Sequence, residues 1–490
     1  MKRLIVLSLF VLPVLVLGIL FGTPAFSADD PKWVVAYKNG DYETALKELT
    51  LLAEGGSDSA QYNLGVMHLE GIVTPQDSDK AFMWTHLSAE QGYVTAQVSL
   101  GSSYYMGEGV AQDYKKAFNW FQLAADQGSA AAQSNIGVIY FEGGGVPKDY
   151  IEARKWFELS AEKEYPDAQF NLGVLFDEGL GVPISKEAAF KWYELAAENG
   201  HSDAQFILGV AYKSGEGVTQ NYNTSLKWFK LAALQGDVSA QFRLGKIYSK
   251  GEGVVQNQKE AIKWYKLAAE QGQVDAQHNL GLRYLRGRGV LEDFNLAFKW
   301  FKLAAKQGQA EAQNKLGTMY GNGHGVGQDN IESIKWFRLS AEQGYALAQK
   351  NLGSMYYEGN GIQQSTEDAI KWFRLAAKQG EAFSQNFMSV MYATGEGVAQ
   401  DYVQAVKWSK LTAEQGHADG QANLAVFLSK GQGIKRDYLY AYMWFKLASD
   451  QGLERADKAL AEIIPQLSDN LLDEAKRLTQ ECLAKNYQGC

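Results

Sequence analysis

A repeat of 36 residues is the feature that most limits how this chain of 490 residues can fold. One small residue, which we call the anchor, recurs eleven times at this spacing without insertion or deletion. The anchors are Gly65, Gly101, Gly137, Gly173, Gly209, Gly245, Gly281, Gly317, Gly353, Ser389 and Ala425. Eleven of the twelve tryptophans, from Trp84 to Trp444, keep the same spacing. Such a period predicts a stacked array of similar small units and not a set of unrelated globular domains.

Each unit is predicted to be a pair of helices joined by a glycine-rich turn. In residues 167–179, Ala168, Leu172 and Phe176 recur at every fourth position, which is the spacing of one helix face. The anchor is small because a neighbouring helix is expected to cross there. A Gly-x-Gly-Val turn follows, and a short Asp, Asn or Ser then precedes the second helix, where it can cap the N-terminus. A Gln-Gly pair ends the second helix.

The repeats extend over residues 57–452, and the flanking segments differ from them. Residues 28–56 match only the second half of a unit. Residues 453–490 are interrupted by Pro465 and continue as a last helix that Ser468 or Asp469 can cap. Because the end units of a stacked array expose an apolar face, we expect both segments to act as caps.

Alanine, Leu-Gly, tyrosine, Gly-x-Gly-Val, aspartate, alanine, tryptophan and Gln-Gly, in this order and at this period, resemble the Sel-one-like repeat family, a relative of the tetratricopeptide repeat. The resemblance covers residues 57–452. It implies an all-α fold, a right-handed superhelical α-solenoid of eleven helix–turn–helix repeats. It also implies a non-catalytic scaffold or adaptor for protein complexes, a role that such proteins often have in bacterial envelopes and at host contacts.

A second function follows from a branch of the same family. Some exported relatives carry a cysteine pair in each repeat, and a β-lactam-binding or hydrolysing activity has been proposed for them. The alternative is therefore a cell-envelope enzyme that acts on peptidoglycan or β-lactams. No repeat of this chain contains a cysteine, which weakens that link.

Two repeat junctions depart from the pattern. Residues 70–73 lack the second turn glycine, because Val73 stands in its place. Residues 162–166 replace the Gln-Gly pair with Lys163 and Glu164. Both departures predict a local bend or a weaker turn within the same fold.

Residues 1–27 have the pattern of a signal peptide. Lys2 and Arg3 precede an uncharged apolar run, and Ala25 and Ser27 supply the small residues of a cleavage site. The apolar run is nearly long enough to cross a bilayer, so an uncleaved anchor is the alternative. Either form places the repeats outside the cytoplasm, in the periplasm or in secreted form, with any membrane link made only through this segment.

Charge and cysteine content narrow the partners and the chemistry. The formal net charge is −9, and cleavage after Ser27 removes two basic residues and no acidic one. An acidic protein disfavours nucleic acid and anionic membrane as partners, so we expect a protein or peptide partner bound by a monomer. The only cysteines, Cys482 and Cys490, form either one terminal disulfide or two free thiols.

The candidate binding surface is a stripe along the first helices, predicted to line the concave face. Its positions lie three residues before the anchor and one and four residues after it, which places them on one helix face. The named candidates are Phe170, Val174, Phe206, Val210, Lys213, Phe242, Lys246, His278, Leu282, Tyr105, Phe141 and Tyr357. Phe170, Phe206 and Phe242 would form an aromatic ladder able to anchor a partner. Packing of these three rings against neighbouring repeats is the alternative.

Residue patterns of catalysis or cofactor binding are missing from the repeats. The six histidines share no ligand spacing and the chain has no Cys-x-x-Cys, so we expect no metal. The glycine-rich residues 321–327 lack the lysine of a phosphate-binding loop and follow a helix, so they are predicted to be an ordinary repeat turn. We therefore expect no cofactor and no catalytic residues.

Overall fold

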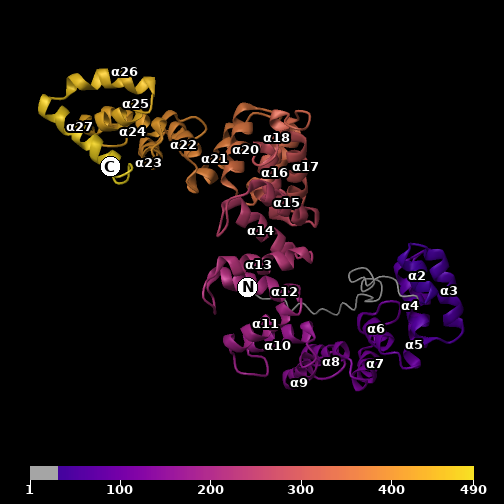
Figure 1. Ribbon diagram of the computed structural model, residues 1–490. Coiled ribbons are helices and arrows are strands. Elements are labelled where there is room, and N and C mark those ends of the chain that lie inside the picture. Colours follow the sequence, from indigo (N-terminus) through magenta and orange to yellow (C-terminus); the bar gives the residue numbers. More distant parts are fainter. Residues whose placement is uncertain (1–30) are drawn as a thin grey trace. The chain divides into compact units, whose positions relative to one another are not determined.

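Residues 31–490 are described by a computed structural model of the chain (Figure 1). The predicted signal peptide and its cleavage site lie outside these residues. Within residues 31–490 the regular elements are 26 α-helices, α2 to α27, and one short 3-10 helix. The all-α prediction is therefore confirmed for the described part of the chain.

Eleven helix–turn–helix hairpins follow one another along the chain. Their first helices are α4 (Asp58–Glu70), α6 (Val94–Met106), α8 (Ala130–Glu142), α10 (Pro166–Glu178), α12 (Ser202–Ser214), α14 (Val238–Lys250), α16 (Val274–Arg286), α18 (Ala310–Asn322), α20 (Ala346–Glu358), α22 (Ala382–Thr394) and α24 (Ala418–Lys430). Their second helices are α5 (Ser78–Glu90), α7 (Tyr114–Asp126), α9 (Tyr150–Ala161), α11 (Lys186–Glu198), α13 (Tyr222–Leu234), α15 (Gln258–Glu270), α17 (Phe294–Lys306), α19 (Asn330–Glu342), α21 (Thr366–Lys378), α23 (Tyr402–Glu414) and α25 (Tyr438–Ser449). From α2 to α13 and from α15 to α25, consecutive helices pack on one another, as in an α-solenoid.

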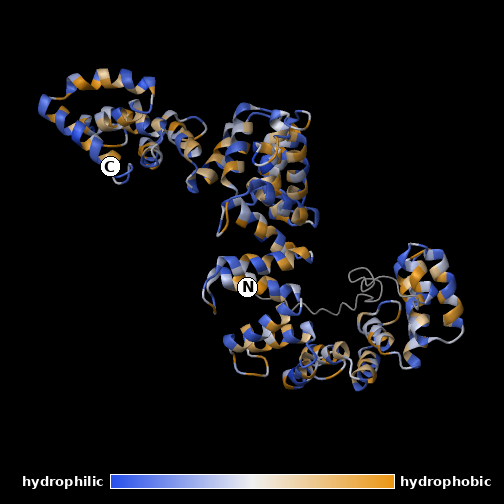
Figure 2. Ribbon diagram, in the orientation of Figure 1, coloured by the Kyte–Doolittle hydropathy of each residue, from blue (hydrophilic) through white to orange (hydrophobic). Residues whose placement is uncertain are grey.

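The chain divides into two compact units, residues 1–244 and 245–490, with the division inside α14. In both units the helices carry polar and apolar faces side by side, so the apolar core is distributed over all the hairpins (Figure 2). This distribution is what stacking requires, because each hairpin buries its apolar face only against its neighbours.

Capping residues set the helix limits in every repeat. In the seventh repeat the Asp293 carboxylate accepts a hydrogen bond of 2.9 Å from the backbone N–H of Leu296 and so begins α17. Gly287 ends α16 with a φ of 61°, and Gly308 follows α17 with a φ of 91°. These left-handed conformations favour glycine, which lacks a Cβ atom. The predicted capping and turn positions are confirmed.

The anchor is small because an aromatic ring lies against it. A Cβ atom added to any of the eight glycine anchors from Gly101 to Gly353 would lie 2.6–3.1 Å from a Phe or Tyr ring of the second helix. We call the site of this ring, twenty residues after the anchor, the ring position. In the tenth repeat, whose anchor is Ser389, the ring position holds Ser409, and two small residues replace a glycine and a ring.

A buried glutamine network joins successive repeats and was not predicted. Gln277 donates a hydrogen bond of 3.1 Å to the carbonyl of Ala269 in the preceding helix, and its own oxygen accepts one of 2.9 Å from Gln307. An equivalent glutamine, at most 8% exposed, lies four residues before every anchor. The glutamines are Gln61, Gln97, Gln133, Gln169, Gln205, Gln241, Gln277, Gln313, Gln349, Gln385 and Gln421. Buried amides need such partners, which explains why the residue type is constant.

The junction at residues 162–166 interrupts this network. Lys163 donates to the carbonyl of Gly128 over 2.6 Å, but the side-chain oxygen of Gln133 has no hydrogen-bond partner. Glu164 adopts a φ of 58° where the other repeats have glycine, and Val73 adopts 73° in the first repeat's turn. Left-handed conformations are strained for residues with a Cβ atom. Both departures thus keep the fold and weaken it locally.

Additional helices flank the repeats. α2 (Lys32–Lys38) and α3 (Tyr42–Glu54) precede them, and α26 (Glu454–Ile463), the 3-10 helix Ile464–Gln466 and α27 (Asp469–Ala484) follow. α26 and α27 pack on α25 through Ala456, Leu460 and Ala475, which belong to the buried cluster of the last repeat. Ser468 occupies the N-cap of α27, but its side chain makes no capping hydrogen bond.

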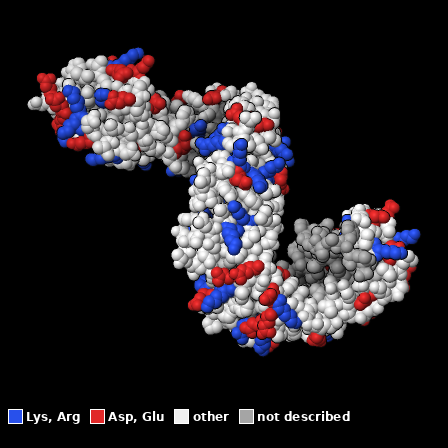
Figure 3. Space-filling model, in the orientation of Figure 1, with Lys and Arg blue, Asp and Glu red and all other residues white. Residues whose placement is uncertain are grey.

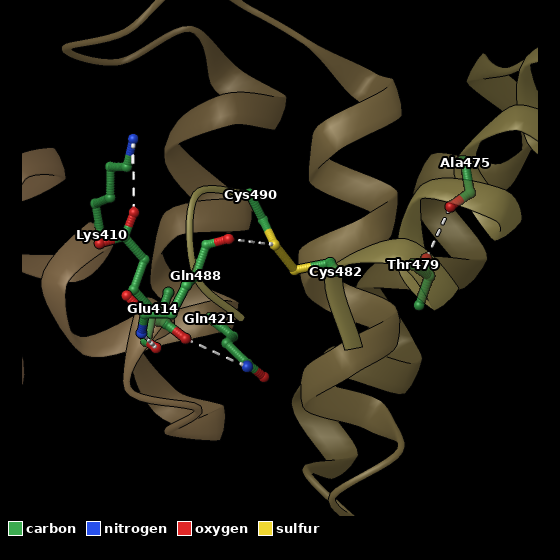
Figure 4. The surroundings of a disulfide bond; sticks show 9 residues. Lys410, Glu414, Gln421, Ala475, Thr479, Cys482, Gln488 and Cys490 are labelled. Carbon is green, nitrogen blue, oxygen red and sulfur yellow. Dashed lines mark hydrogen bonds and ion pairs between the residues drawn. A yellow bond between two sulfur atoms is a disulfide. The ribbon is translucent and has the colours of Figure 1, made fainter. Parts of the chain in front are cut away.

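The two cysteines form a disulfide at the end of the chain (Figure 4). Their Cα atoms lie 5.6 Å apart, and Cys482 is buried in the cluster beneath α27. Gln488, between them, donates a hydrogen bond of 2.7 Å to the carbonyl of Glu414 in α23. The bridge and this contact together hold the last residues against the tenth repeat.

Candidate protein-binding surface

The predicted stripe lies on the first helices of the repeats, but its members differ in exposure. Phe170 and Val174 belong to α10, Phe206, Val210 and Lys213 to α12, Phe242 and Lys246 to α14, His278 and Leu282 to α16, Tyr105 to α6, Phe141 to α8, and Tyr357 to α20. Phe170, His278 and Tyr105 are at most 7% exposed, and the others are half-buried. The stripe is therefore a mixture of interior and surface side chains.

Phe170 lies in the interior between two repeats. Its ring stacks on the His201 ring at a centroid distance of 4.2 Å and packs against Tyr193 at 5.6 Å. With 6% of its surface exposed, it has little area left for a partner. For Phe170 the packing alternative describes the structure, while Phe206 and Phe242 remain half-buried.

His201 is held neutral by the same surroundings. Its Nδ1 atom accepts a hydrogen bond of 3.3 Å from the backbone N–H of Ala204, and its Nε2 atom lies 3.6 Å from the Asp167 carboxylate. Burial lowers the pKa of His201 to about 4, because the charged form would lose its water. A neutral ring stacks on Phe170 without the cost of a buried charge.

His278 occupies the equivalent stripe position three repeats later. It is 6% exposed, and its ring lies 5.7 Å from that of Phe301. Its Nε2 atom makes no hydrogen bond and lies 3.5 Å from a Glu311 carboxylate oxygen. Burial lowers the pKa of His278 below its usual value. The residue therefore packs as a neutral aromatic ring and shows no sign of ligand binding.

Aromatic residues at the outer end of the stripe pack within repeats and between them. The Tyr105 hydroxyl donates a hydrogen bond to the Glu142 carboxylate of the next repeat, and burial raises the pKa of Tyr105 above its usual value. Phe141 packs against the Tyr150 ring at 5.2 Å. Tyr357 packs against the Phe387 ring at 5.0 Å. The Tyr105 and Tyr357 rings therefore contribute to the packing between repeats, and the Phe141 ring contributes to the packing within its own repeat.

The first repeat contains a cavity that sequence reasoning missed. It has a volume of about 520 Å³ and lies between α4, α5 and α6. Gly65 and Thr85, the anchor and the ring position of this repeat, both line it. The signal was present in the sequence, because Thr85 and Ser409 alone lack the Phe or Tyr that the other ring positions carry.

A shallower hollow of about 350 Å³ lies between α18, α19 and α20. Gly321 lines it at a stripe position that holds tyrosine in Tyr105 and Tyr357. Uncharged polar side chains make up most of the remaining lining, among them Asn322, Asn351 and Ser354. Substitution of a large stripe residue by a small one again leaves space at the surface.

A second row of apolar side chains lies on the second helices. One leucine follows each tryptophan of the repeat by three residues, and in ten repeats it is 36–47% exposed. These residues are Leu87, Leu123, Leu159, Leu195, Leu231, Leu267, Leu303, Leu339, Leu375 and Leu411. The row is a competing binding surface that the sequence also displayed, and it supplies matched controls for the stripe.

Charge is unequal in the two units. Residues 1–244 carry 18 Lys and Arg against 29 Asp and Glu, whereas residues 245–490 carry 29 against 27. The acidity of the chain therefore belongs to the first unit. Figure 3 shows charges of both signs spread over the visible face, with broad uncharged areas between them.

In residues 31–490 no group of His, Cys, Asp and Glu side chains is arranged to hold a metal ion. None of the described helices combines the length and the apolar character needed to cross a membrane. The features that this part of the chain offers to a partner are thus its surface rows and hollows.

Comparison with known proteins agrees with this architecture. The model of the Sel1 repeat matches eleven consecutive segments, 58–93, 94–129, 130–165, 166–201, 202–237, 238–273, 274–309, 310–345, 346–381, 382–417 and 418–453. The solved structure of c5321, a protective antigen present in uropathogenic Escherichia coli strains and displaying an SLR fold, is 35% identical over 90% of this chain and 96% of that chain, with a TM-score of 0.75.

Two further solved structures are less similar. A Sel1 repeat protein from Oxalobacter formigenes is 31% identical over 69% of this chain and 99% of that chain, with a TM-score of 0.45. The immunity protein Pa5087 from Pseudomonas aeruginosa is 20% identical over 42% of this chain and 81% of that chain, with a TM-score of 0.29. No curated protein matches the sequence. From the eleven matched segments and the similarity to c5321, we conclude that this chain belongs to the Sel1 repeat family.

Proposed function

We propose that this protein is a non-catalytic scaffold that acts outside the cytoplasm and binds a protein partner along the stripe of its first helices. The observation that carries the proposal is the array of eleven Sel1 repeats, because Sel1 repeat proteins are generally scaffolds for protein interactions. The half-buried stripe residues and the two hollows beside them supply concave, largely uncharged surface, which is the usual material of a binding site.

Three observations support action outside the cytoplasm, in the periplasm or in secreted form. Residues 1–27 have the pattern of a signal peptide. A disulfide such as Cys482–Cys490 persists in oxidising compartments. The similar protein c5321 is a protective antigen. If the signal segment is not cleaved, the same scaffold would be tethered to the membrane.

Capture of partners from envelope extract by the purified protein tests the proposal. We expect Val210→Asp, a substitution at a half-buried stripe position, to lower the recovery of a specific partner at least about tenfold, because a buried carboxylate disrupts an apolar contact. Leu195→Asp, on the outer row of the second helices and 42% exposed, is the matched control and should leave recovery unchanged.

The opposite result would place the binding site on the second helices. If Leu195→Asp removes the partner and Val210→Asp does not, the partner binds the leucine row and the proposed stripe is wrong. If neither variant changes recovery, or no protein is retained specifically, the scaffold proposal itself fails.

A further inference from the structure

The residue at the ring position distinguishes the first repeat from most of the other repeats. Nine of the eleven repeats have Phe or Tyr at this position, and each of these rings is at most 5% exposed. In the second repeat the Phe121 ring lies against Gly101 and is fully buried. In the first repeat Thr85 stands at the same place, and its short side chain lies against Gly65. The volume of a ring is therefore missing from this repeat.

The neighbouring helix does not fill the vacated space. α6 presents Ser99, Ser102 and Ser103 to the cavity, whereas α8 carries Asn135, Val138 and Ile139 at the equivalent positions of the next repeat. Small residues thus occur together on two walls of the cavity, on α5 and on α6. A single large-to-small substitution in a core usually destabilises a protein, because it leaves a cavity. Here Thr85 and the three serines all border the same hollow, which has a volume of about 520 Å³. That volume lies within the range of ligand-binding pockets.

The lining defines what the cavity can hold. Tyr62 and Val66, at most 4% exposed, form an apolar floor, and Leu69 and Met106, more than a third exposed, lie at the rim. Thr85 and the three serines supply hydroxyl groups on the other walls. This combination suits a flat apolar group with a polar end, since hydroxyls can pair with the end while the floor contacts the ring.

The charge of the cavity lining further limits which chemical groups the cavity can bind. Glu108 is the one charged residue in the cavity lining, and it is exposed. A phosphate would need cationic partners and a metal ion would need several carboxylates or imidazoles, and the lining provides neither set. An acidic group at the rim favours a positive charge beside the bound group.

We propose that this cavity binds the side chain of a tyrosine or phenylalanine that a partner protein presents next to a lysine or arginine. The partner's ring takes the space that the repeat's own ring fills elsewhere in the array, and its basic neighbour pairs with Glu108. The inference rests on the proposed scaffold function and names the kind of residue that the partner inserts.

Titration with p-cresol, the side-chain analogue of tyrosine, tests the cavity without any partner. Carbon-13 spectra of the methyl groups of Val66, Leu69 and Met106 in the purified protein should shift and reach saturation. Thr85→Phe supplies the missing ring from the chain itself and should weaken p-cresol binding at least about tenfold. Thr85→Ser keeps the cavity and should change the affinity less than about twofold.

Two controls show whether a loss of binding comes from a filled cavity or from a folding defect. Thr85→Phe should melt no lower than the unsubstituted protein, because the second repeat accommodates the same residue as Phe121. If it nevertheless fails to fold, Ser103→Ile restores the residue type of Ile139 and should block the cavity instead. Absence of methyl shifts at the solubility limit of p-cresol, or equal binding by Thr85→Phe or Ser103→Ile, overturns the inference.

Selection of peptides from a random display library tests which residues of a partner bind in the cavity. We expect retained peptides to contain Tyr or Phe beside Lys or Arg, to be lost on Thr85→Phe, and to bind about threefold more weakly to Glu108→Gln at low salt. Selection of aromatic-free peptides overturns the proposal. A concentration-dependent increase in mass that Thr85→Phe abolishes would place a second copy in the cavity and overturn it as well.

Failure of this inference differs from failure of the scaffold proposal. If Thr85→Phe captures the envelope partner as well as the unsubstituted protein does, the cavity is not the site, while the stripe proposal stands. If p-cresol and aromatic peptides bind but no partner is recovered, the scaffold proposal fails and the cavity's specificity stands.

Discussion

The fourth and the first repeats use the same two positions in opposite ways. In the fourth, Phe170 on the stripe and Tyr193 at the ring position fill the interior, with His201 stacked on Phe170. In the first, Tyr62 occupies the stripe position, but Thr85 leaves the ring position hollow. The fourth repeat, whose ring position holds an aromatic residue, is thus packed more tightly than the first. If the first repeat binds a partner as proposed, its site lies where the unit departs from the repeat pattern and not where aromatic residues are most numerous.

Removal of the Phe170 ring should have the largest effect on this comparison. We expect Phe170→Ala to destabilise the first unit by about 4 kcal/mol, because a buried ring is lost and a cavity is left. Thr85→Ala, in the repeat that is already hollow, should cost less than about 1 kcal/mol. Urea unfolding followed by circular dichroism measures both. Equal midpoints for the two variants would show that Phe170 is not part of the core.

Protonation of His201 should weaken the fourth repeat on acidification. The folded chain holds His201 neutral with a pKa of about 4, while the unfolded chain takes up a proton near the usual value of 6.5. Stability is therefore complete above pH 6.5 and falls as the pH decreases towards about 4, by about 3 kcal/mol. His201→Gln should remove this part of the pH dependence. The first repeat has Tyr93 at the equivalent position, but burial also lowers the pKa of His68 in α4, so the His201→Gln variant isolates the effect of His201. Parallel stability curves for both proteins between pH 7 and 4 would contradict it.

Substitution of the glycine anchor by alanine should distinguish repeats whose ring position holds an aromatic residue from the first repeat, whose ring position is hollow. At Gly101 an added Cβ would lie 2.7 Å from the Phe121 ring, and we expect Gly101→Ala to cost about 2 kcal/mol. At Gly65 it would lie 2.8 Å from the Thr85 hydroxyl, which can rotate into the cavity, and 3.0 Å from the Ala81 carbonyl oxygen, which must shift slightly, so the cost should be smaller than at Gly101, about 1 kcal/mol. Hydrogen exchange of α4 and α6 amides reports each repeat separately. Similar losses of protection in both would mean that the first repeat is as tightly packed as the second.

Restoring the glutamine network should have the smallest effect. Lys163→Gln gives the unpaired Gln133 oxygen a donor and should stabilise the first unit by about 1 kcal/mol. The reverse change, Gln127→Lys at the preceding junction, should cost a similar amount because Gln127 donates to Gln97 over 2.8 Å. Chemical denaturation of both variants measures the difference. A destabilising Lys163→Gln would show that the Gly128 contact of Lys163 matters more than the amide pair.

Sequence reasoning predicted the fold because the repeat shows it eleven times. Helix limits, caps and the small anchor follow from glycine and aspartate at fixed places, and local physics decides them. The exposure of Phe170 could not be predicted in the same way. A residue's place on a helix face is set by its own unit, but its burial depends on His201 at the junction with the next repeat.

Other features were visible in the sequence and were not used. A constant glutamine before every anchor and a constant leucine after every tryptophan mark the network and the outer row. Thr85 was equally visible as a departure from Phe or Tyr. Its consequence was harder to see, because the cavity also depends on Ser99, Ser102 and Ser103, which lie on a different helix and replace the Asn, Val and large apolar residues of most other repeats.

The amide network has a mechanical consequence. In the first unit, Gln61, Gln97, Gln205 and Gln241 each donate a hydrogen bond to a carbonyl of the preceding helix, whereas Gln133 and Gln169 make no such bond. The junction between α9 and α10 lacks this bond and also holds Glu164 in a left-handed conformation, which makes it the weakest connection of the unit. Pulled from its ends, or attacked by a protease, the unit should part first between α9 and α10. A break there would release the first three repeats, cavity included, as one piece.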